Sequence, residues 1–263
     1  MKRNAIARII VYSLIVLALT SFLIAGILSN GFVFSLHSSS GTVVDYEARV
    51  DAAPIEEISI NWVGGTVVIK AEDVDHIIFR ETCPNPIKKQ MTYRCADGVL
   101  ELNHSQSTVS IGINHTQDKD LVVIVPLNWS CQELSIHGTG VSVTIADLSI
   151  GNLEIDGAGT ALNFSGSIHQ LEVNGAGCDI RLDCSDRPKN ITLDGAGCVL
   201  SLTLPEHCGF QLEMDGLGCE LDTSLSFRRQ DGVYLSGDGY CKIEVNGIGC
   251  DIAISEAAES AHE

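Results

Sequence analysis

The segment Leu171-Glu-Val-Asn-Gly-Ala-Gly177 is one of six copies of a single phrase. In each copy two apolar residues flank a polar one, and Asp, Asn or His then precedes a Gly-x-Gly unit. The first glycines stand at positions 138, 157, 175, 195, 216 and 247, so the spacings are 19, 18, 20, 21 and 31 residues. A repeat of this length indicates a stack of similar coils. The other copies are Leu134-Ser-Ile-His-Gly-Thr-Gly140, Leu153-Glu-Ile-Asp-Gly-Ala-Gly159, Ile191-Thr-Leu-Asp-Gly-Ala-Gly197, Leu212-Glu-Met-Asp-Gly-Leu-Gly218 and Ile243-Glu-Val-Asn-Gly-Ile-Gly249.

Apolar and polar residues alternate on both sides of each Gly-x-Gly unit, which predicts two short strands in every repeat. In the copy quoted first, Leu171 and Val173 are the inward positions before the unit, and Cys178, Ile180 and Leu182 are those after it. The alternation restarts one residue out of phase, so the chain is expected to turn a corner there. Glycine permits the positive φ angles of such a corner, and Asp or Asn before it favours a turn.

The repeats predict an all-β protein whose fold is a single-stranded parallel β-helix, or β-solenoid, with coils of about 20 residues. Equivalent strands of neighbouring coils would pair in parallel, about 4.8 Å apart. A β-sandwich of short strands with glycine turns is the alternative. That fold does not require equivalent positions to match in residue size through six copies, and these positions do match.

The amino-terminal part of the chain has the pattern of a membrane anchor. Lys2, Arg3 and Arg8 precede Ile9–Ser29, a stretch of 21 residues without a charge. Such a stretch is long enough to cross a bilayer as a helix, and the preceding positive charges favour a cytoplasmic amino end. We therefore expect a cytoplasmic terminus at 1–8, one transmembrane helix at 9–29 and a linker at 30–50. A cleaved signal peptide is the alternative, although Ile27-Leu-Ser-Asn-Gly31 is a poor cleavage site.

The rest of the chain is expected to be one β-solenoid domain at 51–255, with an acidic tail at 256–263. Its first part, 51–131, is less regular than the Gly-x-Gly coils at 132–255. The segment Ser224–Tyr240 widens the last spacing and is predicted to be an insertion or a partial extra coil, so that an irregular last coil caps the stack. The strands expected in the first part are Ile58–Trp62, Thr66–Ile69, Ile77–Phe79, Leu100–Leu102, Val109–Ile111 and Leu121–Val125.

Three sets of motifs resemble the bacterial putative-adhesin family of β-strand-repeat proteins, a domain of unknown function. They are Ile58-x-Ile60 with Gly65-x-Val67-x-Ile69, then Asp120-Leu-Val-Val-Ile-Val-Pro126, then the Gly-x-Gly coils. The resemblance covers Glu56–Ser255. It implies a membrane anchor ahead of a solenoid, and some members of the family accompany envelope-stress regulators. It implies no catalytic residue.

The charge balance excludes one class of partner. The chain has 34 acidic and 16 basic residues, for a formal net charge of -18. Nucleic acid is not an expected partner, because contacts to phosphate need Lys and Arg. An acidic surface suits a solvated extracytoplasmic domain that stays apart from anionic surfaces.

Cysteines are the first group of residues that might carry chemistry. Four of the ten fall in one slot after Gly-x-Gly, where the first two coils have Val141 and Thr160, so we predict a column of free thiols in the core. A zinc site is the alternative, but zinc takes four ligands around one point whereas a column spreads them along a line. Cys83 and Cys95 bracket a loop and are the best candidates for a disulfide. The column consists of Cys178, Cys198, Cys219 and Cys250, and no role is assigned to Cys131, Cys184, Cys208 and Cys241.

Outward-facing acids are the second group. Glu154 is expected to stack on Glu172, and Glu213 on Glu244 if the insertion does not separate their coils. Stacked like charges repel each other, and Ca²⁺ would relieve the repulsion because it prefers oxygen ligands. The favoured interpretation has no calcium: Asp and Asn cap the turn backbone and the Glu side chains extend into water. The corner column consists of Asp156, Asn174, Asp194, Asp215 and Asn246.

No pattern typical of an enzyme is present. The eight histidines are scattered without metal-ligand spacing, and there is no Gly-x-Ser-x-Gly elbow, phosphate-binding loop or dinucleotide fingerprint. We therefore expect no catalytic, cofactor-binding or metal residues and no cofactor.

The expected function is that of a non-enzymatic, single-pass membrane protein with an extracytoplasmic β-solenoid that acts as an adhesin or as a binding or scaffold module of the cell envelope. Its partner would be an envelope protein or a glycan. One alternative is an accessory or sensor of an envelope-stress response whose Met1–Arg8 end meets a cytoplasmic or membrane partner. A carbohydrate-active β-helix enzyme is a further alternative, although the loops are mostly too short to build a substrate groove.

Overall fold

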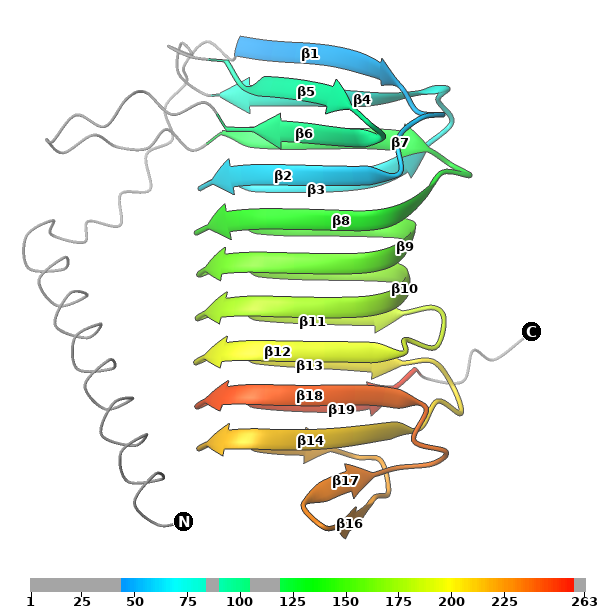
Figure 1. Cartoon of the computed structure of the whole chain (residues 1–263), viewed down its shortest axis with the longest axis vertical. Helices are drawn as coiled ribbons and strands as arrows, with labels where there is room; N and C mark the ends of the chain where they lie inside the picture. Colours follow the sequence, from blue (N-terminus) through cyan, green and yellow to red (C-terminus); the bar gives the residue numbers. More distant parts are fainter. Residues whose placement is uncertain (1–43, 84–89, 105–118, 258–263) are drawn as a thin grey trace, which may run out of the picture. The chain divides into compact units, whose positions relative to one another are not determined.

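The computed structural model describes residues 44–83, 90–104 and 119–257, and every regular element in these ranges is a β-strand (Figure 1). The all-β class expected from the sequence is confirmed. The described strands form one mixed sheet. They are β1 (Val44–Asp51), β2 (Glu57–Val63), β3 (Thr66–Glu72), β4 (His76–Cys83), β5 (Thr92–Ala96), β6 (Val99–Asn103), β7 (Asp120–Pro126), β8 (Ser130–Thr139), β9 (Ser142–Ala158), β10 (Ala161–Ala176), β11 (Asp179–Cys184), β12 (Asn190–Ala196), β13 (Val199–Leu204), β14 (Phe210–Leu217), β15 (Glu220–Thr223), β16 (Arg228–Gln230), β17 (Val233–Leu235), β18 (Cys241–Ile248) and β19 (Asp251–Glu256).

Two parallel ladders run through the Gly-x-Gly repeats. The first ladder joins the strands that precede the corner, and in it β10 pairs with β12 so that Gly175 lies opposite Gly195. The second ladder joins the strands that follow the corner, and in it β11 pairs with β13. The long strands β9 and β10 take part in both ladders, with a register shift between Ser165 and Gly166. Equivalent residues of neighbouring repeats therefore lie opposite one another in both ladders.

The inward side chains of both ladders form a single hydrophobic cluster. On β10 the positions predicted to face inward, Leu171 and Val173, are 2% and 1% exposed, while Glu172 between them is exposed. Burial of each such side chain contributes about 1.5–3 kcal/mol before the entropy cost of folding is counted. The period-two pattern thus accounts for which side of each strand meets the core.

The two glycines of a corner are needed for different reasons. A Cβ atom on Gly175 would lie 2.1 Å from the carbonyl oxygen of Gly157, so the backbones of neighbouring repeats come too close for any side chain. A Cβ atom on Gly177 would meet nothing, but this residue has a φ of 64°, in the left-handed region that glycine tolerates. Its N–H donates to the carbonyl oxygen of Ala196 at 2.9 Å, which continues the hydrogen-bond ladder around the corner.

The last two repeats do not follow the order of the sequence. Strand β18 pairs on one side with β12, where Ile243 meets Ile191, and on the other side with β14, where it meets Leu212. In the second ladder β19 likewise lies between β13 and β15. Figure 1 shows β18, in red, between β12 and β14. The expectation that each coil rests on the one before it, with the last coil as the cap, is wrong for this part of the chain.

The segment between these two repeats forms an antiparallel hairpin. Strands β16 and β17 pair with each other, and β17 also pairs with β14 through Gln211 and Leu212. The prediction of an insertion in Ser224–Tyr240 is confirmed. The hairpin and the fifth repeat, not the sixth, make up this end of the ladders. After the hairpin the chain returns, and the sixth repeat lies between the fourth and the fifth.

The amino-terminal part has a similar arrangement. Strand β2 pairs in parallel with both β6 and β8, and β3 with both β7 and β9. The chain therefore leaves the first pair of strands for the outer strands β4 to β7 and then returns to the inner side. Pairs β1–β4, β4–β7 and β5–β6 are antiparallel, which makes the sheet mixed. The strands expected at Ile58–Trp62, Thr66–Ile69, Ile77–Phe79, Leu100–Leu102 and Leu121–Val125 are confirmed.

Four expectations concern segments outside the Gly-x-Gly repeats. Strand β1 begins at Val44, inside the 30–50 segment that was expected to be a linker. The anchor expected at 9–29, the strand expected at Val109–Ile111 and most of the acidic tail lie outside the described residues. Within the ranges that are described, no helix has the length and apolarity needed to cross a membrane.

Candidate functional site

The corner residues that precede Gly-x-Gly form a column in which acids and amides alternate. Asn174 lies opposite Asp156 on one side and Asp194 on the other. Asn246 lies opposite Asp194 on one side and Asp215 on the other. In the sequence Asp194 and Asp215 are consecutive members of the set, and it is the transposed repeat that separates them. The column is therefore free of neighbouring aspartates.

Side-chain hydrogen bonds connect this column. Asn246 Nδ2 donates to Asp194 Oδ1 at 2.8 Å, and His137 Nδ1 lies 3.4 Å from Asp156 Oδ2. Asn174 Nδ2 donates to Glu172 Oε1 at 3.1 Å. These contacts differ from the expected capping of turn backbone, and they supply donors between the acids without a metal. Among the described residues, no group of three or more His, Cys, Asp or Glu side chains is arranged to hold a metal ion.

The outer face of the first ladder is acidic. Glu172 lies opposite Glu154, and Glu213 lies opposite Glu244, as expected from the sequence. Further along the same ladder Glu57 is in register with Glu133. Burial raises the pKa of Glu57, and the nearby negative charges of Glu133 and Glu101 raise it further.

Two columns on the outer face of the second ladder are different, because across β9, β10, β11 and β13 they contain mostly hydroxyl and amide side chains. Thr144 lies opposite Asn163, which lies opposite Arg181, which in turn lies opposite Ser201. A parallel column on the same face contains Ser165, Asp183, Thr203 and Ser255. The guanidinium of Arg181 donates to Asp179 Oδ2 at 2.7 Å. Hydrogen-bond donors and acceptors thus recur from strand to strand on this face.

Three open depressions lie on this face and around the next corner. One of about 350 Å³ lies over the two hydroxyl columns, and it shares Ser165 and Asp183 with a second of about 450 Å³. The second shares Ser149 and Ser167 with a third of about 370 Å³, which reaches Arg187. The depressions are therefore adjacent. We call the part formed by Thr144, Asn163, Ser165, Arg181, Asp183 and Ser201 the hydroxyl groove.

The four cysteines of the repeated slot form one column, in the spatial order Cys178, Cys198, Cys250 and Cys219. The backbone N–H that follows each of the last three donates to the carbonyl oxygen of the cysteine before it, at 2.8, 3.0 and 2.9 Å. All four are free, which confirms the predicted column of thiols. Three are buried, and Cys219 is partly exposed because its repeat ends the ladders.

The thiols of Cys178, Cys198 and Cys250 occupy the space that a side chain on the glycine of the same corner would need. The Sγ atom of Cys198 lies 3.6 Å from the carbonyl oxygen of Gly175, and the other three thiols lie 3.6–3.7 Å from the equivalent glycine oxygens. A Cβ atom on Gly195 would come within 2.9 Å of the same sulfur. A hydrogen bond from Cys198 lowers the pKa of the Cys178 thiol to about 6, against the effect of burial, and raises the pKa of Cys198.

The other cysteines do not form the expected bridge. Cys95 is free and exposed on β5, whereas Cys83 is buried at the end of β4, so no disulfide joins them. The two residues flank the same loop, but their strands pair with different partners: Cys95 lies opposite Leu100, and Cys83 opposite Val44. Burial raises the pKa of Cys131 and of Cys184 to about 12, which makes both thiols poor nucleophiles.

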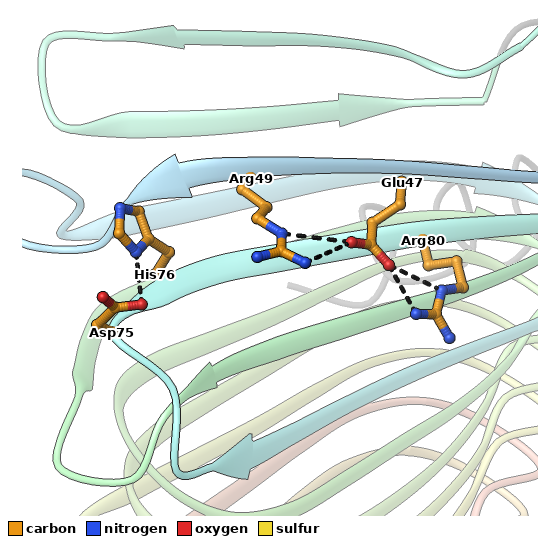
Figure 2. Close-up of polar contacts among 5 residues, drawn as sticks. All are labelled: Glu47, Arg49, Asp75, His76 and Arg80. Carbon is orange, nitrogen blue, oxygen red and sulfur yellow. Dashed lines mark hydrogen bonds and ion pairs between the residues drawn. The ribbon is translucent and has the colours of Figure 1, made fainter.

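A cluster of charges lies on β1 and β4 (Figure 2). Glu47 accepts hydrogen bonds from Arg80 at 2.6 Å and from Arg49 at 3.0 Å, and these bonds lower the pKa of its carboxyl group. His76 Nδ1 lies 2.6 Å from Asp75 Oδ1, and this contact lowers the pKa of Asp75. All these groups are on the surface, where ion pairs add little stability. Sequence reasoning missed this cluster, because most of β1 lies in the 30–50 segment, where a linker is expected.

Among the residues that the structure describes, one ion pair is buried. Lys119 Nζ lies 2.8 Å from Glu81 Oε1, and the two side chains are 3% and 0% exposed. Glu81 Oε2 accepts the backbone N–H of Met91 at 2.9 Å, and the carbonyl oxygen of Lys119 accepts the indole N–H of Trp62 at 2.9 Å. Sequence reasoning missed this pair. A signal was present, because Glu81 continues the inward phase of Ile77 and Phe79 on β4.

No family model and no curated protein matches this chain. Solved structures do match. The crystal structure of a putative adhesin from Bacteroides fragilis has 14% sequence identity and a TM-score of 0.51, over 82% of this chain and 97% of that one. A putative cell adhesion protein from Clostridium sporogenes has 13% identity and a TM-score of 0.48, over 82% of this chain and 100% of that one. The first of these comparisons shows that the chain shares its fold with a protein named as a putative adhesin.

Proposed function

We propose that the chain is a non-enzymatic binding module of the bacterial cell envelope, with an extracytoplasmic β-solenoid held at the membrane by one amino-terminal helix. The parallel registers of both ladders support the solenoid, since equivalent residues of successive repeats meet in each. The uncharged stretch at 9–29 behind three positive residues supports the anchor. The name of the Bacteroides fragilis protein suggests adhesion, and the proposal extends that role to this chain.

The hydroxyl groove is the observation that carries the binding role. Its hydroxyl, amide and guanidinium groups recur at the strand spacing of about 4.8 Å, and they lie in adjacent open depressions. This surface presents a hydrogen-bonding side chain on each of four successive strands, and the group changes between hydroxyl, amide, guanidinium and carboxylate. It therefore suits a long, polar ligand that lies across several strands, and a neutral glycan has that chemistry. The acidic outer face of the first ladder disfavours anionic polymers there.

Binding to isolated cell envelopes tests this function. The full chain, tagged at its carboxyl end, is compared with Arg181→Ala, which removes the charged donor of the hydroxyl groove. Arg94→Ala is the matched control, because Arg94 is also exposed and has its own acidic neighbour, Glu101, at 3.9 Å. Arg181→Ala should weaken binding about 10- to 150-fold, since a hydrogen bond to a charged group contributes about 1.5–3 kcal/mol. Equal binding by the two variants contradicts the assignment of the groove.

The anchor needs a separate test. Membrane and soluble fractions are immunoblotted for the full chain and for a variant that lacks residues 1–30. We expect the full chain in the membrane fraction at its full mass, with its carboxyl end open to protease added from outside, and the variant in the cytosol because it has lost its export segment. A shortened full-length product that is wholly released indicates a cleaved signal peptide instead.

A further inference from the structure

The thiol column is more regular than packing requires. The same slot is filled by Val141 in one repeat and by Thr160 in the next, and both are buried. Thr160 Oγ1 even lies 3.5 Å from the carbonyl oxygen of Gly138, the contact that each cysteine makes with its own glycine. Valine and threonine therefore satisfy the steric and hydrogen-bonding demands of the slot. Packing alone therefore does not explain why four neighbouring repeats at one end of the ladders have cysteine in this slot, and a chemical role for the thiols would explain it.

The four cysteines lie on neighbouring strands of one ladder. The backbone hydrogen bonds of that ladder place Cys198 between Cys178 and Cys250, and Cys250 between Cys198 and Cys219. Parallel strands are about 4.8 Å apart. Two metal–sulfur bonds of about 2.3 Å placed end to end span about 4.6 Å. A metal ion would therefore fit between two successive sulfurs with little movement of the backbone.

The linear arrangement of the sulfurs limits which metal ions can bind to the column. Zinc needs four ligands around one point, and no group of three or more candidate ligands among the described residues is arranged in that way. Soft thiolates prefer monovalent ions of the copper group, and these ions accept two sulfurs in a straight line. Carbonyl oxygens at 3.6–3.7 Å from the sulfurs are too distant to act as ligands.

We propose that Cys178, Cys198, Cys250 and Cys219 form a linear binding site for Cu(I), with one ion between each pair of successive sulfurs. Four thiols leave three such intervals. Starting from four protonated thiols, full loading releases four protons and binds three monovalent cations, so the charge of the column changes from zero to −1. No electron is transferred. The partly exposed Cys219 is the point of entry, because the other three sulfurs are buried.

Metal titration of the full chain in detergent tests the site. The reduced protein is titrated without oxygen with Cu(I) buffered by a chelator that binds it competitively, and bound copper is followed by the ultraviolet absorption of the copper–thiolate bond. We expect uptake of three ions. X-ray absorption of the loaded protein should show two sulfur neighbours and no nitrogen or oxygen neighbour. Uptake should become weaker as the pH falls, because the thiols must lose their protons.

Cysteine variants separate the column from other thiols. Cys198→Ser removes two of the three intervals and should lower the capacity to one ion. Cys219→Ser removes only the last interval and should lower it to two, and its partly exposed position makes it the safer variant for folding. Cys131→Ser, which removes a buried cysteine outside the column, should still take up three. The proposal is overturned if the wild type takes up no Cu(I), if Cys219→Ser keeps the full capacity, or if copper has three or four ligands.

Discussion

The buried pair of Glu81 and Lys119 allows a quantitative test of the amino-terminal part of the fold. The change is Lys119→Met, which keeps the apolar length of the side chain but leaves the Glu81 carboxylate without its cation. Glu81 is fully buried, so water does not reach the carboxylate to replace the lost partner. Breaking a buried ion pair in this way costs about 3–5 kcal/mol, a large share of the stability of a typical domain. We expect the free energy of unfolding to fall by that amount.

The double variant Glu81→Leu with Lys119→Met distinguishes charge from packing. With both charges removed, no unpaired ion is left inside, and replacement of a buried pair by apolar residues is often close to neutral. The lost hydrogen bond from the Met91 backbone to Glu81 still costs about 1–3 kcal/mol. The double variant should therefore be more stable than Lys119→Met alone, although it carries one more substitution.

Urea denaturation of the full chain, followed by far-ultraviolet circular dichroism, measures these differences. The matched control is Lys70→Met, which breaks the ion pair of Lys70 with Glu72 at 2.6 Å. Both of those side chains are more than 40% exposed, so this control should lose at most about 1 kcal/mol. If Lys119→Met unfolds at the same urea concentration as the control, or if the double variant is less stable than Lys119→Met, the reasoning is refuted.

Three further predictions follow from the corners and the surface. Gly175→Ala should destabilise the protein by more than about 4 kcal/mol, because its Cβ would meet a backbone oxygen at 2.1 Å. Gly177→Ala should cost only about 1–2 kcal/mol, because alanine tolerates its left-handed φ poorly. A melting temperature for Gly175→Ala that is equal to or higher than that of Gly177→Ala would contradict this prediction. Asn246→Asp would bring three carboxylates together, so its melting temperature should fall and then recover with millimolar Ca²⁺, while that of the wild type stays the same with Ca²⁺ or EDTA. Because the pKa of Glu47 is lowered from 4.5 in the folded protein, its contacts with the arginines stabilise the fold above pH 4.5, and this stabilisation is lost as the pH falls through the folded-state pKa. Arg80→Ala should therefore make the melting temperature depend less on pH between pH 5 and 3. The same pH dependence in Arg80→Ala and the wild type would contradict this prediction.

Some features of the candidate site were readable from local pattern and others were not. The thiol column and the stacked glutamates were predictable, because they require only that equivalent positions of neighbouring repeats face each other. In the corner column, Asp156, Asn174 and Asp194 follow the order of the sequence. The placing of the residues of the last two repeats beside them was not predictable, because it depends on which repeat lies beside which. The buried pair of Glu81 and Lys119 joins residues that are 38 apart in the chain, and no local period connects them.

The sequence by itself determined the strands, the inward and outward faces and the corners, because period-two alternation and the Gly-x-Gly unit act within a few residues. Only the tertiary structure decided the order of the repeats. All the repeats have similar inward side chains, so local pairing does not distinguish one neighbour from another. The last repeat presents Val245 and Ile254 to the core where the fifth has Met214 and Thr223, and these latter two are partly exposed at the end of the ladders. Placing the more apolar repeat inside buries more apolar surface, and the hairpin β16–β17 gives the chain the length it needs to return there.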